Sequence, residues 1–177
     1  MRRFASPWDR QLLTSTIALL AVIAFTAIAG TAGALQATMR GIALAVAVFS
    51  SGIAIGAWAL APRGFVIGDG RLRILRNGWR SVQVPLSEIR TVSILDGDAL
   101  RGSLKLLGMG GLFGYYGVFR SPVLGSYRLH ATRGSGLVLV RTQTHNHVLT
   151  PEPAEDFAEA LLAAAPRARR ERLRPAR

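Results

Sequence analysis

Two long stretches without a charged residue dominate the first third of this 177-residue chain. The first covers residues 11–39 with an apolar core at residues 12–35, and the second covers residues 41–62. A bilayer core about 30 Å thick is crossed by about 20 helical residues, so each stretch is long enough to span it. Two fully buried helices would be unusual in so short a chain, and the apolar region of a signal peptide has only about 7–15 residues. The sequence therefore predicts two transmembrane helices.

The connection at residues 36–40 is short, so the two helices are expected to form an antiparallel hairpin at residues 12–61. Cytoplasmic flanks of membrane spans carry an excess of arginine and lysine. Three arginines precede the first span and five follow the second closely, whereas the connection holds only Arg40. We therefore expect both termini in the cytoplasm, with residues 1–11 as a short cytoplasmic segment.

Gly52 and Gly56 form a G-x-x-x-G spacing in the second span. This spacing lets another helix approach closely in a membrane. The pattern predicts helix packing at these glycines. The packing would be either against Ala18 and Ala21 within the hairpin or against a second copy of the chain.

From about residue 64 the pattern changes to short apolar runs separated by turn residues, which is typical of β-strands. Asn77-Gly78 is a strong signal for a two-residue hairpin turn, and polar and apolar side chains alternate before Pro85. Strands are expected at residues 65–67, 72–76, 79–84, 91–95, 115–119, 125–131, 137–142 and 147–149.

A helix is expected to follow the last strand. Thr150 can cap it, acidic residues occupy its first turn, and Pro166 ends it. Phe157, Leu161 and Ala164 share one face, which would pack on the strands. The predicted fold class is a membrane-anchored α+β protein. Its transmembrane hairpin is followed at residues 64–165 by a small β sandwich or barrel capped by a C-terminal helix, and then by a basic tail at residues 166–177.

Three segments of this domain resemble a known family: "FVIGDGRLRILRNGWRSVQVPLSEIRTV", "GMGGLFGYYGVFRSPVLGSYRLHAT" and "LVLVRTQTHNHVLTPEPAEDFAEAL". Their order is similar to that of the bacterial pleckstrin-homology-like (PH-like) domains. The most specific pieces are the "VPLSEI" turn, the glycine-aromatic block before a strand, and the final strand and helix with Phe157. The resemblance implies a PH-like fold behind one or two membrane spans. It also implies a binding or assembly module in a bacterial inner membrane, not an enzyme.

The block "LGMGGLFGYYGVFR" at residues 107–120 is rich in glycine and aromatic residues. A dinucleotide fingerprint needs G-x-G-x-x-G at a strand-to-helix turn. Here Phe113 stands where the third glycine belongs, and the block leads into a predicted strand. The block is therefore interpreted as part of the domain packing. The alternative is that Phe113, Tyr115 and Tyr116 contact the membrane or a partner.

The net charge is +12, and 22 residues are lysine or arginine. Arg71, Arg73, Arg76 and Arg80 surround the predicted turn and are candidates for contact with anionic lipid or a partner, the alternative being solvated surface arginines. The acidic turn at residues 68–70 argues against phosphoinositide recognition there. The tail, with six arginines in residues 167–177, is expected to be disordered and attracted to the inner leaflet. Nucleic acid is disfavoured as a partner because this charge lies beside a membrane.

The chain has no cysteine, so it has no thiolate metal site and no thiol nucleophile. His130, His145 and His147 could bind zinc only if the fold brought all three together, and packed or solvated histidines are the alternative. No carboxylate pair and no Ser/His/Asp set is indicated by spacing. The sequence predicts no catalytic residue, no metal site and no cofactor.

The leading hypothesis is an integral membrane protein that presents a PH-like scaffold module at the cytoplasmic face for protein–protein assembly. The alternative is a domain at the membrane surface that responds to lipid head groups. The expected partners are the lipid bilayer, an unidentified protein and, in one alternative above, a second copy of the chain.

Overall fold

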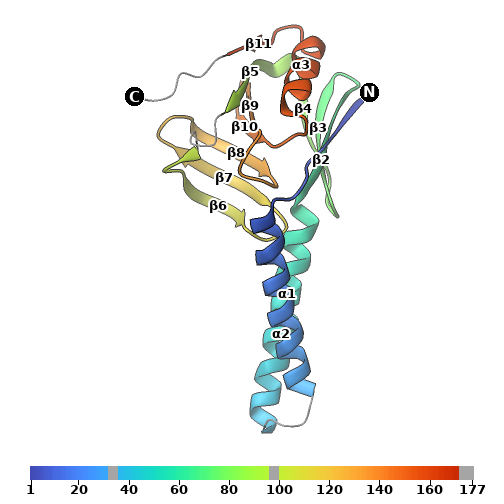
Figure 1. Ribbon diagram of the computed structural model, residues 1–177, viewed down its shortest axis with the longest axis vertical. Coiled ribbons are helices and arrows are strands. Elements are labelled where there is room, and N and C mark those ends of the chain that lie inside the picture. The colour runs from blue at the N-terminus through green and yellow to red at the C-terminus, as the bar shows by residue number, and fades with distance from the viewer. Residues whose placement is uncertain (32–35, 96–99, 172–177) are drawn as a thin grey trace.

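The computed structural model describes residues 1–31, 36–95 and 100–171, and it places a β-rich domain at one end of a two-helix stalk (Figure 1). The stalk consists of α1 (Arg10–Thr31) and α2 (Ala37–Leu60). Both helices are long and apolar enough to be candidate membrane spans. The N-terminus and the β-rich domain lie at one end of the hairpin, and the last turn of α1 and the first turn of α2 lie at the other (Figure 1).

The two helices pack through small residues. On α1 the buried residues Leu12, Thr16 and Gly30 lie on one face. A Cβ atom added at Gly30 would lie 2.9 Å from the Cγ atom of Leu44, so the helices approach closely there. This is the small-residue packing expected of membrane helices, where close backbone approach replaces the hydrophobic effect. The buried residues of α2 are all alanines: Ala47, Ala54 and Ala57.

The predicted packing of Gly52 and Gly56 inside the hairpin is wrong. A Cβ atom at either glycine would meet nothing within 4 Å, and their expected partners Ala18 and Ala21 are exposed. Each glycine lies two residues from the buried Ala54, which places it about 200° around the helix. Packing of these glycines against a second copy of the chain stays a prediction.

The domain is built from two sheets. The first is antiparallel, with the order β1-β2-β3-β4. The second has the order β11-β5-β9-β10-β8-β7-β6, in which only the pairs β10–β8 and β11–β5 are parallel. The bounds are β1 (Arg2–Ala5), β2 (Pro62–Gly68), β3 (Arg71–Arg76), β4 (Val82–Pro85), a 3-10 turn (Leu86–Glu88), β5 (Ile89–Leu95), β6 (Leu104–Gly110), β7 (Tyr115–Ser121), β8 (Gly125–Ala131), β9 (Leu137–Thr142), β10 (Asn146–Leu149), α3 (Ala154–Ala164) and β11 (Arg169–Arg170).

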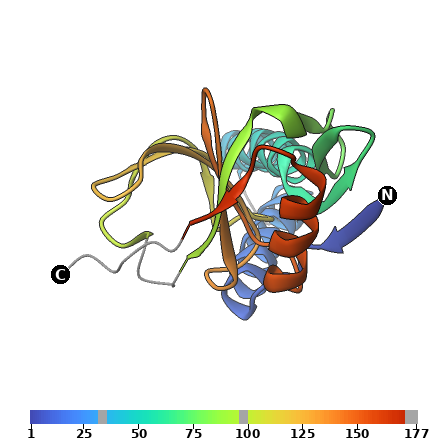
Figure 2. The same cartoon turned by 90° about the horizontal axis from the view of Figure 1, so that it is seen from above.

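The core lies where α3 packs on both sheets, and Figure 2 shows this helix beside the strands, seen from above. Phe157 of α3 is fully buried, and its ring meets Phe4 and Phe65 edge-on at centroid distances of 5.1 and 5.8 Å. Such aromatic contacts add to the free energy gained from burying apolar area. The predicted α+β fold class, with its capping helix, is therefore confirmed.

Two details of the predicted helix are wrong. Thr150 does not cap α3, because its hydroxyl group is buried and accepts a hydrogen bond from the Thr132 N–H at 3.0 Å. Ala164 is exposed, and the buried residues Ala158 and Ala160 lie on the core side instead.

The segment before the hairpin belongs to the domain. β1 pairs with β2 in antiparallel register, with Arg2 opposite Ile67 and Ala5 opposite Gly64. Phe4 from β1 is buried in the core. The hairpin is therefore inserted between two neighbouring strands of one sheet, whereas the sequence predicted residues 1–11 only as a separate segment.

The basic tail begins as folded chain. β11 pairs with β5, and the Glu171 N–H donates a hydrogen bond to the carbonyl oxygen of Val92 at 3.1 Å. The Glu171 carboxylate also lies 3.7 Å from Nε of Arg141. The predicted disorder is wrong for residues 169–171, because the edge of β5 offers backbone hydrogen bonds, and residues 172–177 lie outside the described residues. β11 lies at the end of the domain away from the hairpin (Figure 1).

The domain–hairpin junction as a candidate functional site

The glycine-aromatic block is a β-hairpin whose tip rests on the helices. Strands β6 and β7 pair in antiparallel register, and residues 111–114 form the turn between them. The Ser15 hydroxyl group of α1 donates a hydrogen bond to the carbonyl oxygen of Gly111 at 2.5 Å. The Phe113 N–H donates to the hydroxyl group of Thr16 at 3.2 Å. The block therefore packs on the helical hairpin, and the alternative that its aromatic residues contact the membrane or a partner stays a prediction.

Glycine is required where the two strands of this block approach each other most closely. Gly108 and Gly117 are paired across the strands and have φ angles of 143° and 136°. A Cβ atom at Gly108 would lie 2.2 Å from the carbonyl oxygen of Tyr116, and one at Gly117 would lie 2.2 Å from that of Leu107. No side chain fits in this space.

The aromatic residues of the block have different surroundings. Phe113 and Tyr116 are buried in a cluster with Ala54, Ala57 and Ala61 at the end of the hairpin. The Tyr116 hydroxyl group donates a hydrogen bond to the Ala57 carbonyl oxygen at 2.7 Å, and burial raises the pKa of Tyr116 to about 12. The adjacent Tyr115 is half-buried and packs against a separate cluster in the second sheet.

The sequence Asn77-Gly78 does not form the predicted two-residue turn. β3 ends at Arg76 and β4 begins at Val82, so residues 77–81 form a longer loop. In this loop the Gly78 N–H donates a hydrogen bond to the Ala59 carbonyl oxygen at 3.1 Å. The Asn77 side chain donates to the Trp58 carbonyl oxygen, also at 3.1 Å. The carbonyl groups in the last turn of α2 accept hydrogen bonds from this loop, and these contacts with the helix explain why the local turn signal failed.

All three tryptophans of the chain lie at this junction, and each is exposed. Trp8 precedes α1 and its ring contacts Phe113 at a centroid distance of 6.1 Å. Trp58 is in the last turn of α2, and Trp79 follows Gly78 in the docked loop. Tryptophan is enriched at the boundary between a membrane and water. The junction therefore has the residue composition expected of a protein surface that lies in the head-group layer of a membrane.

The structure separates the four candidate arginines. Arg71 and Arg73 point outward from β3, where Arg71 donates to Gln83 Oε1 at 2.5 Å and Arg73 pairs with Asp69 at 2.6 Å. Arg80 is exposed in the docked loop. Arg76 is half-buried and shares the inward face of β3 with the buried residues Leu72 and Ile74. Successive side chains of a strand point to opposite faces, so Arg76 lies on the same face as Leu72 and Ile74, and Arg71 and Arg73 lie on the other. The sequence spacing alone could have indicated this difference.

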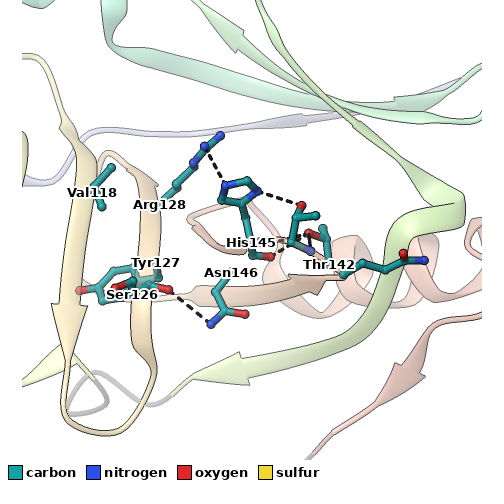
Figure 3. A pocket seen from close by; sticks show the side chains of 9 residues that line it. Val118, Ser126, Tyr127, Arg128, Thr142, His145 and Asn146 are labelled. Carbon is teal, nitrogen blue, oxygen red and sulfur yellow. Dashed lines mark hydrogen bonds between the residues drawn. The ribbon is translucent and has the colours of Figure 1, made fainter.

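Arg76 lies in a cleft between the two sheets. The cleft has a volume of about 240 Å³. It adjoins a second hollow of about 340 Å³, which shares Val118 and Arg128 with it (Figure 3). Figure 3 shows Arg128 reaching toward His145, with its guanidinium group 2.9 Å from Nε2 of His145. The cleft is lined by Leu60, Arg76, Val82, Tyr116, Gly117, Val118, Arg128 and His130.

The fold brings the three histidines together. His130 and His147 are stacked at a centroid distance of 5.8 Å, and His145 lies 6.3 Å from His147. Burial first, and then the nearby charges, lower the pKa of His130 to about 3 and that of His147 to about 4. Both are therefore neutral at pH 7. Within the described ranges, no three His, Cys, Asp or Glu residues form a group that could hold a metal ion.

Two sheets closed by a C-terminal helix, with a basic cleft between them and a helical hairpin below, define a small membrane-anchored β domain of the PH type. Residues 63–165 match the family model described as Bacterial PH domain. This match covers more than half of the chain, and the chain belongs to this family. Neither the curated proteins nor the solved structures contained a match. β1 and the hairpin lie outside the matched residues.

Proposed function

We propose that this protein is a non-catalytic, membrane-anchored module that presents its PH-like domain for protein assembly at the cytoplasmic face of the bacterial inner membrane. The observation that carries the proposal is that two paired strands join the domain to the hairpin. The chain enters and leaves the hairpin through β1 and β2, which are paired with each other. A loosely tethered domain could reach lipid in any orientation, whereas a fixed domain presents the same face to every partner it meets.

The family match supports the non-catalytic role, because PH domains are generally binding modules. The cytoplasmic placement rests on the arginines that flank the hairpin, three before α1 and five soon after α2. The tryptophans at the junction support a position of this end of the hairpin at a membrane–water interface, on either side of the membrane.

The edge strand β6 is the surface that we assign to a protein partner. Leu104, Leu106 and Leu107 are 69%, 58% and 75% exposed. The outer edge of β6 has no neighbouring strand among the described residues. An edge strand with exposed apolar side chains is a template for pairing with another chain. Lipid could cover the leucines, but it could not satisfy the backbone groups of the edge as a protein strand does.

Photo-crosslinking of the full chain in its native membrane tests this function. A photoreactive residue at Leu107 should give a discrete adduct with a second protein. The matched control is Val123, which is also exposed but lies in the turn between β7 and β8. An adduct of the same size at both positions, or none at Leu107, would contradict the assembly role.

A second candidate function is a response to lipid head groups. The exposed tryptophans and the cleft favour it, because both lie where the domain meets the end of α2. In the same experiment, adducts of Leu107 with lipid alone would favour this candidate over protein assembly.

A further inference from the structure

Two arginines in the cleft, Arg76 and Arg128, have no acidic partner among the residues that the structure describes. Arg73, Arg133 and Arg141 each lie within 4 Å of a carboxylate oxygen. Within residues 1–31, 36–95 and 100–171, no such pair is formed by Arg76 or Arg128. Among the described residues, no aspartate or glutamate lines the cleft or the adjoining hollow.

Arg76 is half-buried, and part of its guanidinium group is withdrawn from water. Its Nε atom is buried and has no hydrogen-bond partner among the described residues. Burial lowers its pKa from the ordinary value. Withdrawing a charge from water costs free energy unless an opposite charge or hydrogen bonds offset the cost. A protein that keeps such a group therefore gains from it in another state, and a bound anion would provide the missing partner.

Arg128 reaches the same space from the opposite sheet. It lies on β8, whereas Arg76 lies on β3, and both line the cleft. The only hydrogen bond described for its guanidinium group is to the ring of His145. A guanidinium group has five N–H donors, so Arg128 retains donors for a ligand.

His130 adds a polar atom to the wall of the same cleft. Its side chain lines the cleft and the residue is only 5% exposed. Its Nε2 atom is buried without a hydrogen-bond partner among the described residues. A neutral imidazole has one N–H donor, which can serve an anion. The two arginines also act on this histidine: after burial and His147, the charges of Arg76 and Arg128 contribute to lowering the pKa of His130.

The cleft lies at the membrane end of the domain. Leu60 from the last turn of α2 forms part of its wall. Tyr116, which also lines it, is hydrogen-bonded to the Ala57 carbonyl oxygen. By contrast, the acidic turn between β2 and β3 lies at the other end of these strands, where Asp69 already neutralises Arg73.

We propose that this cleft binds the phosphate group of an anionic phospholipid head group, with Arg76 and Arg128 as its two cationic ligands. Paired guanidinium groups suit phosphate because their planar N–H donors match its oxygen atoms. Free inorganic phosphate has the same chemistry and would bind the same groups. The lipid source rests on the membrane placement proposed above, whereas the phosphate chemistry does not.

Native mass spectrometry of the full chain in detergent micelles tests the site. Short-chain phosphatidylglycerol is the probe, diacylglycerol is the arm without phosphate, and inorganic phosphate is titrated separately by calorimetry. The variant R76Q/R128Q should bind phosphatidylglycerol more weakly than the wild type by roughly tenfold or more, since each charge-assisted hydrogen bond contributes that order. Diacylglycerol should bind both proteins equally. If inorganic phosphate alone binds as tightly as the lipid, the ligand is the free anion.

The matched control is R90Q/R120Q, which removes the same charge from two exposed arginines of β5 and β7. This variant should bind phosphatidylglycerol like the wild type. Equal binding by R76Q/R128Q and wild type, or equal loss in both double variants, would overturn the site without affecting the assembly proposal. If R76Q/R128Q does not fold, the exposed single variant R128Q serves instead. The second expected result concerns the wild type: phosphatidylglycerol should protect Arg76 and Arg128 from modification by phenylglyoxal. Modification at the same rate with and without the lipid would overturn the proposed site.

Discussion

Lowering the pH from 7 to 5 should destabilise the domain through two histidines. His130 and His147 are 5% and 4% exposed, and their pKa values in the folded protein are about 3 and about 4. In the unfolded chain the pKa of histidine is about 6.5. Between these values the unfolded chain binds more protons than the folded one, so the free energy of unfolding falls as the pH falls. Their contribution is complete above about pH 6.5.

The magnitude follows from the difference between the two states. At pH 5, protonation of each histidine stabilises the unfolded chain by about 2 kcal/mol. The folded domain gains almost nothing in this way, because both histidines stay neutral in it. The pair therefore lowers the free energy of unfolding by about 4 kcal/mol between pH 7 and pH 5. Domains have total stabilities of about 5–15 kcal/mol, so this is a large share.

Urea unfolding of the full chain in micelles measures this effect. Tryptophan fluorescence is a suitable signal because all three tryptophans lie where the domain meets the hairpin. The variant His147→Gln should show about half of the pH dependence. A urea midpoint that stays constant from pH 7 to pH 5 would refute the reasoning, because it would mean that both histidines protonate freely in the folded domain.

Three further predictions concern the hairpin and its junction. A cysteine at Gln36 should react with an impermeant reagent outside intact cells while one at Ser135 should not, and the reverse labelling would overturn the cytoplasmic assignment. Gly30→Ile should weaken the packing of α1 on α2 because a Cβ atom there already meets Leu44 at 2.9 Å, whereas Gly56→Ile should not; equal thermal stability of the two variants in detergent would argue against this interface. Tyr116→Phe should lower the free energy of unfolding by about 1 kcal/mol, because it removes one of the two hydrogen bonds that the Ala57 carbonyl oxygen accepts and leaves the one from the Ala61 N–H; an unchanged urea midpoint would show that the Tyr116 hydrogen bond is not needed.

The sequence alone determined the elements whose signals are local. The two candidate spans follow from length and the lack of charge, because a bilayer of fixed thickness requires about 20 apolar residues. Most strands followed from alternation and turn residues, and the final helix from its apolar face at Phe157 and Leu161. β6 was missed because apolar and polar residues do not alternate along it. Its three leucines are exposed, so no buried face produced a pattern.

Only the tertiary structure decided which of these elements meet. β1 has no recognisable pattern in its four residues, and it becomes a strand because the hairpin returns the chain beside it at β2. The contact face of α2 is set by the partner helix, so alanines carry it and not the glycines at Gly52 and Gly56. The cleft joins Arg76 and Arg128 from different sheets. Contacts between residues so far apart in the chain depend on the packing of the whole domain, and no local pattern encodes them.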